Sequence, residues 1–588
     1  MNRNTNMHFA NTPSIKVKRS KFDESHSIKT TFNVGDVIPI YVDADILPGD
    51  TVSMDMAEVI RMATPIYPIM DNLYSDIYWF FVPTRLLWEH WAAFWGENES
   101  PWTQTTEYEI PQIEAPTGGW TEGTIADYMG IPTKVDGISV NALPFRAYAK
   151  IWNDWFRDEN LKTCCHMYED ETTRTGQTGA ETGYDYVTGT ELGGTPCKVA
   201  KFHDYFTSCL PSPQKGTAVS LPLSGTLDVY AGQTPHILEG DTAYPINYAI
   251  YKNSDNKTTK GYSINMSSPT NITSLIPGTY EFNGYGSVPK GNGNDRISGG
   301  AIGYTTNISS TTGSYTPVEG GFTPINLYAD MTTATAITVN ELRNCFALQK
   351  YFENAGLHGT RYIEYLKSVF GVTSSDARLQ RAEYLGGQRV PLNIDQIIQT
   401  SSTDNTSPQG NVAGFSCTHN RKSMFTKSFE EHGVLMCLAV TRVDHTYQQG
   451  LEKQWTRKKW TDFYNPYFAH LGEQAVLNEN IYAQGTTTDK QVFGYQEAWA
   501  EYRYKTNKVT GYMRSNATGS LDVWHFADDY STLPQLSGEW IDEPYSNVDR
   551  CIAVTSQLTH QFIADFYFKC AYTRPMPVYS VPGLIDHV

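Results

Sequence analysis

The sequence predicts a mainly β protein, a β-sandwich or barrel whose loops have grown into long insertions that contain several helices. Three observations support this class. Apolar and polar residues alternate near both ends of the chain, turns rich in Gly and Pro separate these segments, and only a few stretches between them have helical periodicity. The chain has 588 residues, enough to bury a sizeable core. A jelly roll is one such arrangement, and pattern alone leaves the choice between sandwich and barrel open.

The first strands follow a polar arm. Residues 1–27 are polar and Asn-rich and then carry a basic patch, and we interpret them as an N-terminal arm. Alternation predicts strands at Thr30–Val34 and Val37–Val42, followed by a turn at residues 48–50. The apolar run Asp76–Val82 predicts a buried strand.

Helical patterns interrupt the strands. The Trp-rich segments 84–96 and 143–158 each place their rings on one face, which favours core packing over a ligand platform. In the first segment, Thr84 is a plausible helix cap and Gly96 a stop. Further helices are predicted at Thr338–Gly356, where Thr338 and Glu341 match a capping box, and at Thr360–Gly371. We expect both to end at their glycine in a left-handed conformation.

Two segments differ in composition from their surroundings. Residues 167–200 are rich in Thr, Gly and Glu and are predicted to form an exposed loop. Residues 217–326 are rich in Gly, Thr, Ser, Asn and Tyr and poor in charge, and short alternating pieces predict strands there at 224–231, 244–252 and 278–286. The predicted organisation is an arm (1–27), a first part of the core with helical interludes (28–216), an insertion forming a surface protrusion (217–326), and a second part of the core with helical and loop insertions (327–588).

Strand patterns return toward the C-terminus. They predict strand-like segments at Gly433–Val443, Ser520–Phe526 and Arg550–Thr573. In the last of these segments apolar and polar residues alternate, but aromatic residues occur on both faces. This is typical of a strand buried between a core and a partner.

Composition limits the class of protein. Aromatic residues make up 13% of the chain, which suits extensive interfaces, although an aromatic-rich β protein without interfaces would look the same. The nine cysteines are scattered without a Cys-x-x-Cys pair, so neither a disulfide framework nor a zinc site is predicted, in keeping with folding in a reducing cytoplasm. The longest apolar runs are too short to span a bilayer, and no membrane insertion is expected.

No common catalytic or phosphate-binding motif occurs, and no cofactor is expected. His432 follows two glutamates and raises the question of a metal ligand or base, but a structural or solvent-exposed role is the more common one. Asp528 and Asp529 raise the question of a divalent cation, although adjacent carboxylates in a polar loop are usually solvated.

Two basic groupings are candidates for contact with single-stranded DNA. Cations beside aromatic rings supply charge for the backbone and flat faces for unpaired bases, although a solvated basic loop at a subunit contact is the simpler alternative. The candidate residues are Lys16, Lys18, Arg19 and Lys21 in the arm, and Lys453, Trp455, Arg457, Lys458, Lys459 and Trp460 in the second core part. The net charge of −18 opposes such contact unless cations gather on one face or a basic partner neutralises the phosphates.

Seven strings occur in order along the chain: RSKFDESHSIKTTFNVGDVIPIY (19–41), RMATPIYPIMDNLYSDIYWFFVP (61–83), HDYFTSCLPSPQKG (203–216), FGVTSSDARLQRAEYLGG (370–387), HTYQQGL (445–451), GEQAVLNENIYAQG (472–485) and VPGLIDHV (581–588). They resemble the major capsid protein of the Microviridae, small single-stranded DNA bacteriophages, in particular the gokushovirus branch. The similarity covers nearly everything except about 167–200 and 217–326.

The resemblance implies an eight-stranded viral jelly roll and a structural role without catalysis. It implies copies of the chain assembling, in the bacterial cytoplasm, into a T=1 icosahedral virion shell around a circular single-stranded DNA genome. Because the chain is acidic, we expect a small basic DNA-binding protein of the same phage on the inner surface, and the resemblance further implies a pilot protein.

In this family the insertion is expected to project at the threefold axes. Its Tyr, Asn, Thr and Gly content resembles adaptable recognition surfaces, which favours attachment to a bacterial surface receptor, with a merely decorative role as the alternative. The candidate attachment residues are Tyr230, Tyr248, Tyr251, Tyr280, Tyr285 and Tyr304.

Two other classes stay open on the residues alone. The Trp and Tyr content also suits a carbohydrate-binding or carbohydrate-cleaving β-sandwich, since a glycosidase needs only two suitably spaced carboxylates. A phage adhesin is the other alternative. Formation of closed particles of uniform size separates a shell subunit from both.

Overall fold

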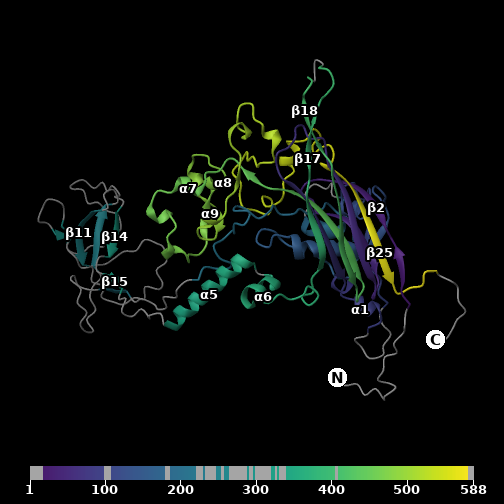
Figure 1. Ribbon diagram of the computed structural model, residues 1–588. Coiled ribbons are helices and arrows are strands. Elements are labelled where there is room, and N and C mark those ends of the chain that lie inside the picture. The colour runs from purple at the N-terminus through teal and green to yellow at the C-terminus, as the bar shows by residue number, and fades with distance from the viewer. Residues whose placement is uncertain are drawn as a thin grey trace, which may run out of the picture. The chain divides into compact units, whose positions relative to one another are not determined.

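The structure, a computed structural model, divides the chain into two compact units (Figure 1). One combines Met1–Thr217 with Tyr351–Val588, and the other is Ala218–Lys350. The residues described are 18–97, 107–178, 186–219, 229–231, 247–252, 257–263, 288–289, 296–297, 320–324, 327–329, 339–359, 361–403 and 408–579. The first boundary lies next to the start expected for the insertion, and the second lies inside a helix, well beyond residue 326.

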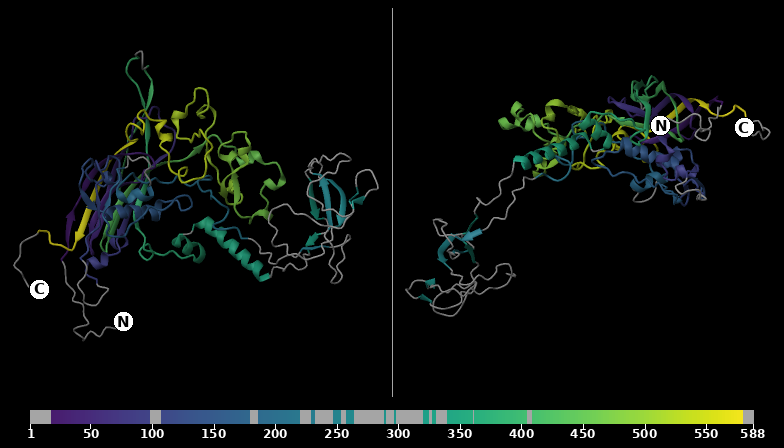
Figure 2. Two further views of the ribbon diagram at one scale, coloured as in Figure 1. Left: turned by 180° about the vertical axis from the view of Figure 1, so that it is seen from behind. Right: turned by 90° about the horizontal axis from the view of Figure 1, so that it is seen from below.

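The first sheet of the larger unit joins the two ends of the chain. Its strands are β1 (Ser20–Asp23), β2 (His26–Phe32), β25 (Phe562–Arg574), β4 (Thr51–Met62) and β19 (Thr418–Ser428). All pairs are antiparallel, with β1 and β2 on one edge of β25 and β4 on the other. Figures 1 and 2 show yellow β25 beside the purple N-terminal strands. Residues 20–27, expected in the arm, therefore belong largely to the sheet.

The second sheet faces the first across the main core. It has the order β16 (Glu383–Pro391), β5 (Leu73–Pro83), β20 (Gly433–Val443) and β3 (Ile38–Ile46), and all pairs are antiparallel. Buried side chains from both sheets form one continuous cluster, so the two sheets are the antiparallel sandwich expected of a jelly roll. Among the described residues, the two sheets hold nine strands rather than eight, because β1 and β2 share one edge.

Alternation explains how β4 and β25 line this core. In β4, every second residue from Val52 to Met62 is buried, and the residues that alternate with these are more exposed. Glu58 occupies one of these inward positions, where Gln388 and Asn420 donate hydrogen bonds to its carboxylate. Burial raises the pKa of Glu58 to about 7.

β20 is buried on both faces, which makes the second sheet the middle of three layers. Leu435, Cys437 and Ala439 face the sandwich core, and the alternate residues Val434 and Met436 face a second core. Helix α3 (Leu143–Ile151) covers this second core and continues as a π-helical turn at Trp152–Phe156. Burial on both faces explains the continuous apolar run of Gly433–Val443, and the strand predicted there is confirmed.

The helix predicted over residues 84–96 is broken. The chain forms a 3-10 turn at Thr84–Leu86 and one α-helical turn, α1 (Trp91–Phe94). The backbone N–H of Thr84 donates to the carbonyl of His432 (3.1 Å), and Leu87 is buried in the second core, so tertiary contacts override the helical periodicity. The predicted stop at Gly96 is confirmed, since its φ is +96°.

The exposed loop predicted at 167–200 is wrong for its C-terminal part. Thr190, Cys197 and Val199 are buried in or beside the second core. The backbone of this segment bonds to residues 35–37: the N–H of Val37 donates to Cys197 (2.9 Å) and that of Val199 to Gly35 (2.9 Å). Backbone pairing with a neighbouring segment, rather than side-chain hydrophobicity, therefore buries it.

Two C-terminal predictions need correction. Residues 520–526 contain a 3-10 turn at Asp522–Trp524 instead of a strand, and the Trp524 ring stacks on Tyr67 (5.2 Å). The strand predicted within Arg550–Thr573 begins only at Phe562. Within β25, Ile563 and Tyr567 are exposed while the alternate residues are buried, so a partner for the outer face stays a prediction.

Two helices follow the insertion. Helix α5 spans Val339–His358, so Gly356 lies inside it, and the left-handed conformation occurs at Gly359 instead; Thr338 lies outside the described residues. Helix α6 spans Tyr362–Phe370 and ends at Gly371 with φ +68°, as predicted.

The smaller unit contains short antiparallel strands. β10 (Asn247–Lys252) pairs with β11 (Lys257–Ser263) and β14 (Gly320–Pro324), and β9 (Val229–Ala231) pairs with β15 (Leu327–Ala329). Strands therefore occur in the predicted pieces 224–231 and 244–252. The piece 278–286 lies outside the described residues.

Candidate nucleic-acid interface

The second basic grouping lies in a loop-rich region that follows β20. Its residues occupy helix α7 (Lys453–Thr456), the three residues after it and the start of a 3-10 turn at Trp460–Asp462. The loop is held locally: the Asp462 carboxylate accepts from the backbone N–H groups of Lys458 and Lys459, both at 2.8 Å.

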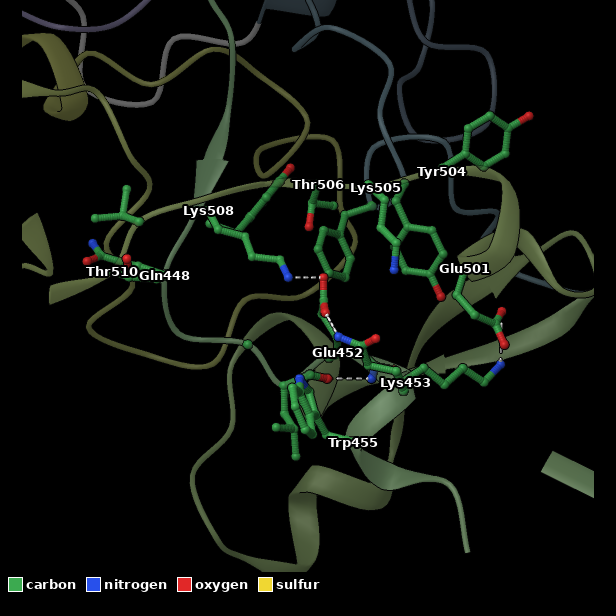
Figure 3. Close-up of a pocket in the computed structure, with 18 of the residues that line it drawn as sticks. Gln448, Glu452, Lys453, Trp455, Glu501, Tyr504, Lys505, Thr506, Lys508 and Thr510 are labelled. Carbon is green, nitrogen blue, oxygen red and sulfur yellow. Dashed lines mark hydrogen bonds and ion pairs between the residues drawn. The ribbon is translucent and has the colours of Figure 1, made fainter. Parts of the chain in front are cut away.

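Part of this grouping lines a pocket of about 550 Å³ (Figure 3). Lys453, Trp455 and Arg457 contribute to its wall, whereas Lys458, Lys459 and Trp460 do not. The opposite wall comes from residues 501–514, including helix α9 (Ala500–Arg503) and the short strand β24 (Asn507–Lys508). The pocket therefore joins two segments about fifty residues apart.

Positive charge is in excess inside the pocket. Five cationic side chains line it, against two carboxylates; the cationic residues are Lys453, Arg457, Lys505, Lys508 and Arg514. Figure 3 shows the Lys508 side chain directed at Glu452. It also shows Lys453 directed at Glu501, at 3.7 Å. Glu501 pairs in addition with Arg457 at 3.3 Å. The hydrogen bond from Lys508 lowers the pKa of Glu452. The surplus of cations contrasts with the net charge of −18 of the chain.

Aromatic rings accompany these cations. The Arg457 guanidinium lies 4.4 Å from the centre of the Tyr502 ring and 5.4 Å from that of Phe463. Trp455 is 72% exposed and Trp460 71% exposed, which leaves both indoles available for stacking. The site thus combines the two components that a single strand requires.

Sequence reasoning missed the second wall of the pocket. Tyr502, Tyr504, Lys505 and Lys508 belong to the string EYRYKTNK, which interleaves rings with cations as the first wall does. This signal was available, but only the structure shows that the two strings meet.

The arm residues do not join this pocket. Lys18 and Arg19 are exposed just before β1, Lys21 is an exposed residue of β1, and Lys16 lies outside the described residues. In Figures 1 and 2 the N-terminal strands and α7 lie well apart. The two groupings are therefore separate candidate contacts.

A buried ion-pair network lies beneath the pocket. His445 donates from Nδ1 to Asp528 (3.0 Å) and from Nε2 to Glu543 (3.1 Å), and Lys201 lies 3.6 Å from Asp528. The backbone N–H of Asp528 donates to the carbonyl of Thr446 (2.9 Å), which ties the network to the strand that precedes the pocket. Asp528 was expected to be solvated in a loop, and this expectation is wrong because it is almost fully buried.

His432 packs among rings. It stacks on Trp95 with 4.9 Å between ring centres, and burial lowers its pKa. Glu431, beside it in sequence, pairs instead with Arg85 (2.7 Å). Within the described residues, no group of three or more His, Cys, Asp or Glu side chains is placed to hold a metal ion.

The tyrosines proposed for attachment belong to the smaller unit. Tyr230 lies in β9, and Tyr248 and Tyr251 lie in β10. Tyr280, Tyr285 and Tyr304 lie outside the described residues. No helix of the described chain combines the length and the apolar character needed to cross a membrane.

The antiparallel sandwich is that of a jelly-roll structural protein. The chain belongs to the capsid protein (F protein) family, whose model matches residues 10–584. It is 40% identical over 574 residues to the capsid protein VP1 of Spiroplasma virus 4, covering 97% of this chain and 96% of that protein. The VP1 of Chlamydia phage 1 is 39% identical over 613 aligned positions (98% and 97% covered), and that of Bdellovibrio phage phiMH2K 40% over 579 (98% and 97%).

These similarities confirm the resemblance to Microviridae capsid proteins. The chain is a structural protein of the virion that assembles into a capsid, and it is not an enzyme. The carbohydrate-active and adhesin alternatives are thereby set aside.

Proposed function

We propose that this subunit assembles in the host bacterial cytoplasm into a T=1 icosahedral shell around a circular single-stranded DNA genome. The observation that best supports the nucleic-acid part is the pocket between residues 453–457 and 501–514, where cations outnumber carboxylates and rings are exposed. Cations follow the phosphate backbone, and rings accept unpaired bases without a sequence requirement.

Replacing Lys458 and Trp460 with alanine should lower the DNA content of particles. Both side chains are exposed, so the variant should fold, and each lost base stack is worth about 1–3 kcal/mol. The measurement is the DNA mass per purified particle, together with the affinity of the unassembled chain for a short oligodeoxynucleotide.

A matched control removes an exposed ring and an exposed cation elsewhere, Trp95→Ala with Lys134→Ala. It should retain the wild-type DNA content. Normal genome content in well-formed Lys458/Trp460 particles would reject DNA contact at this loop.

The net negative charge of the chain supports the proposal of additional partners. A net charge of −18 cannot neutralise a packaged genome, so a small basic DNA-binding protein is proposed at the inner surface, alongside a pilot protein of the same phage. Particles that hold full-length DNA without any basic component would contradict this partner.

The smaller unit is proposed to form the surface protrusion that contacts a bacterial receptor. It is compact in its own right, and both sheets of the sandwich lie outside it. Deleting residues 220–322 should therefore leave particle assembly intact and reduce adsorption to host cells to background. Adsorption and particle yield are measured on the same preparation, and unchanged infectivity would refute the attachment role.

A further inference from the structure

A second pocket, of about 500 Å³, lies at one end of the helix-covered face of the second sheet. The residues that matter for its chemistry are Tyr78, Phe80, Trp155, Tyr384, Arg389 and Arg442. On β20 this face carries Val434, Met436, Leu438 and Val440 and then Arg442, so the apolar series stops at a cation. A charged residue placed in the series of a core face needs a specific partner or a ligand.

One carboxylate serves two guanidinium groups here. Arg389 donates to both oxygens of Asp76 (2.7 and 3.0 Å), which lies directly opposite it across the β5–β16 pair. Arg442 also donates to Asp76 and, at 2.9 Å, to the Tyr78 hydroxyl. Asp76 is almost completely buried, so this is a fixed arrangement and not a surface ion pair.

The cluster keeps one uncompensated positive charge. Asp444, the carboxylate that directly follows β20, accepts hydrogen bonds from Tyr74 and Asn72, and Lys201, also in the wall, lies 3.6 Å from Asp528. The Nε of Arg442 is buried and has no acceptor in the described structure. A guanidinium pair with a single carboxylate has the charge and the donor geometry to take an anion.

Flat apolar surfaces surround this charge. Both guanidinium groups lie against the Phe202 ring, with 4.4 Å for Arg389 and 4.1 Å for Arg442 to its centre. At the rim, Trp155 and Tyr384 are partly exposed and pack against each other at 5.7 Å. Rings beside an unsatisfied cation are the combination that binds a nucleobase and its phosphate.

We propose that this pocket binds a nucleotide, with the phosphate on Arg389 and Arg442 and the base against the Trp155–Tyr384 rim. The volume suits a ligand of that size. The proposal does not rest on DNA contact at the Lys453–Trp460 loop, because the two pockets have no lining residue in common. An acidic side chain from a second copy of the chain would neutralise the charge of the arginine pair but would not stack on the aromatic rings.

The test measures binding of 2′-deoxyadenosine 5′-monophosphate to the full chain by calorimetry. Deoxyadenosine and inorganic phosphate are measured separately, and each should bind at least about tenfold more weakly, because each lacks one half of the contacts. Arg389→Gln should weaken nucleotide binding by about tenfold or more, and Arg389→Lys, which keeps the charge without the fork, by less. Tyr384→Leu should reduce binding while phosphate alone binds as before.

Lys29→Gln is the matched control, since it removes an exposed cation from β2 in the other sheet, and it should bind as the wild type does. A short oligodeoxynucleotide distinguishes a DNA strand from a free nucleotide as the ligand. If the oligodeoxynucleotide and the mononucleotide both bind in a way that depends on Arg389, the pocket takes nucleotides of a strand. If only the mononucleotide binds, the pocket takes a free nucleotide. The proposal is overturned if nucleotide binding is the same in the wild type and in a folded Arg389→Gln variant, or if deoxyadenosine binds as tightly as the nucleotide. It is equally overturned if a structure of the assembled shell places a carboxylate of a second copy on Arg389 and Arg442.

Discussion

Replacing His445 with leucine is expected to lower the free energy of unfolding by about 3–5 kcal/mol, the usual cost of leaving a buried charge without its partner. Both ring nitrogens of His445 lie about 3 Å from carboxylates, Asp528 on one side and Glu543 on the other, and all three side chains are buried. Leucine would fill the space but remove the cation shared by the two carboxylates. Asp528 would keep Lys201 and the hydrogen bonds from Tyr530 and Asn547. Thermal and denaturant unfolding of the unassembled chain measure the effect. His419→Leu, at an exposed position of β19, is the control and should change little.

The same ion pairs predict how stability depends on pH. Burial alone would disfavour the imidazolium, but Glu543 and Asp528 raise the pKa of His445 from 6.5 to about 10. Because the folded-state value is the higher one, the stabilisation is fully present below about pH 6.5 and is lost as the pH rises through about 10. The unfolding midpoint of the wild type should fall more steeply across that window than the midpoint of His445→Leu. Parallel profiles would contradict a charged His445.

Placing aspartate at both Val369 and Phe370 is expected to abolish particle formation. Helix α6 is apolar, yet none of its residues is buried, and Tyr362, Val369, Phe370 and the following Val372 are 51–65% exposed. A capsid subunit has copies of itself to cover such a surface, and a central apolar anchor in an interface is worth about 2 kcal/mol or more. Since each contact repeats around the shell, its loss is multiplied.

Sedimentation and electron microscopy of the purified variant provide the measurement. The unfolding midpoint should stay close to the wild-type value, because the substituted side chains are already exposed. Ser368→Asp adds one negative charge on the same helix without removing apolar area and should still assemble. Particles from the double variant at wild-type yield would exclude α6 from the subunit contacts.

The sequence pattern predicted the local structure correctly where one physical cause dominated. The apolar run Gly433–Val443 predicted a strand, and the structure gives that strand the same bounds. Gly371 and Gly96 were predicted to end helical segments, and both have positive φ. In these cases periodicity or backbone conformation acts within a few residues.

Prediction failed where contacts with segments distant in sequence determine the local structure. Cys197 and Val199 are buried although their surroundings are polar, because their backbone groups pair with Val37 and Gly35. The segment that starts at Thr84 forms only a 3-10 turn and one α-helical turn, with Leu87 and Trp88 buried in the second core. Tertiary contacts of this kind leave no local pattern in the sequence.

The two candidate sites differ in the same way: one could be predicted from local sequence and the other could not. The loop at 453–460 was found from its cations and rings, and the matching string at 501–508 could have been found by the same rule. The cluster of Asp76, Arg389 and Arg442 could not, since its members come from three strands and the two arginines lie 313 and 366 residues from Asp76. Only strand register brings them together.

Electron microscopy of the purified wild-type chain tests most directly whether this protein acts by packing against copies of itself. We predict closed particles of one size. A chain that remains monomeric under every assembly condition, with its α6 surface uncovered, would contradict the account.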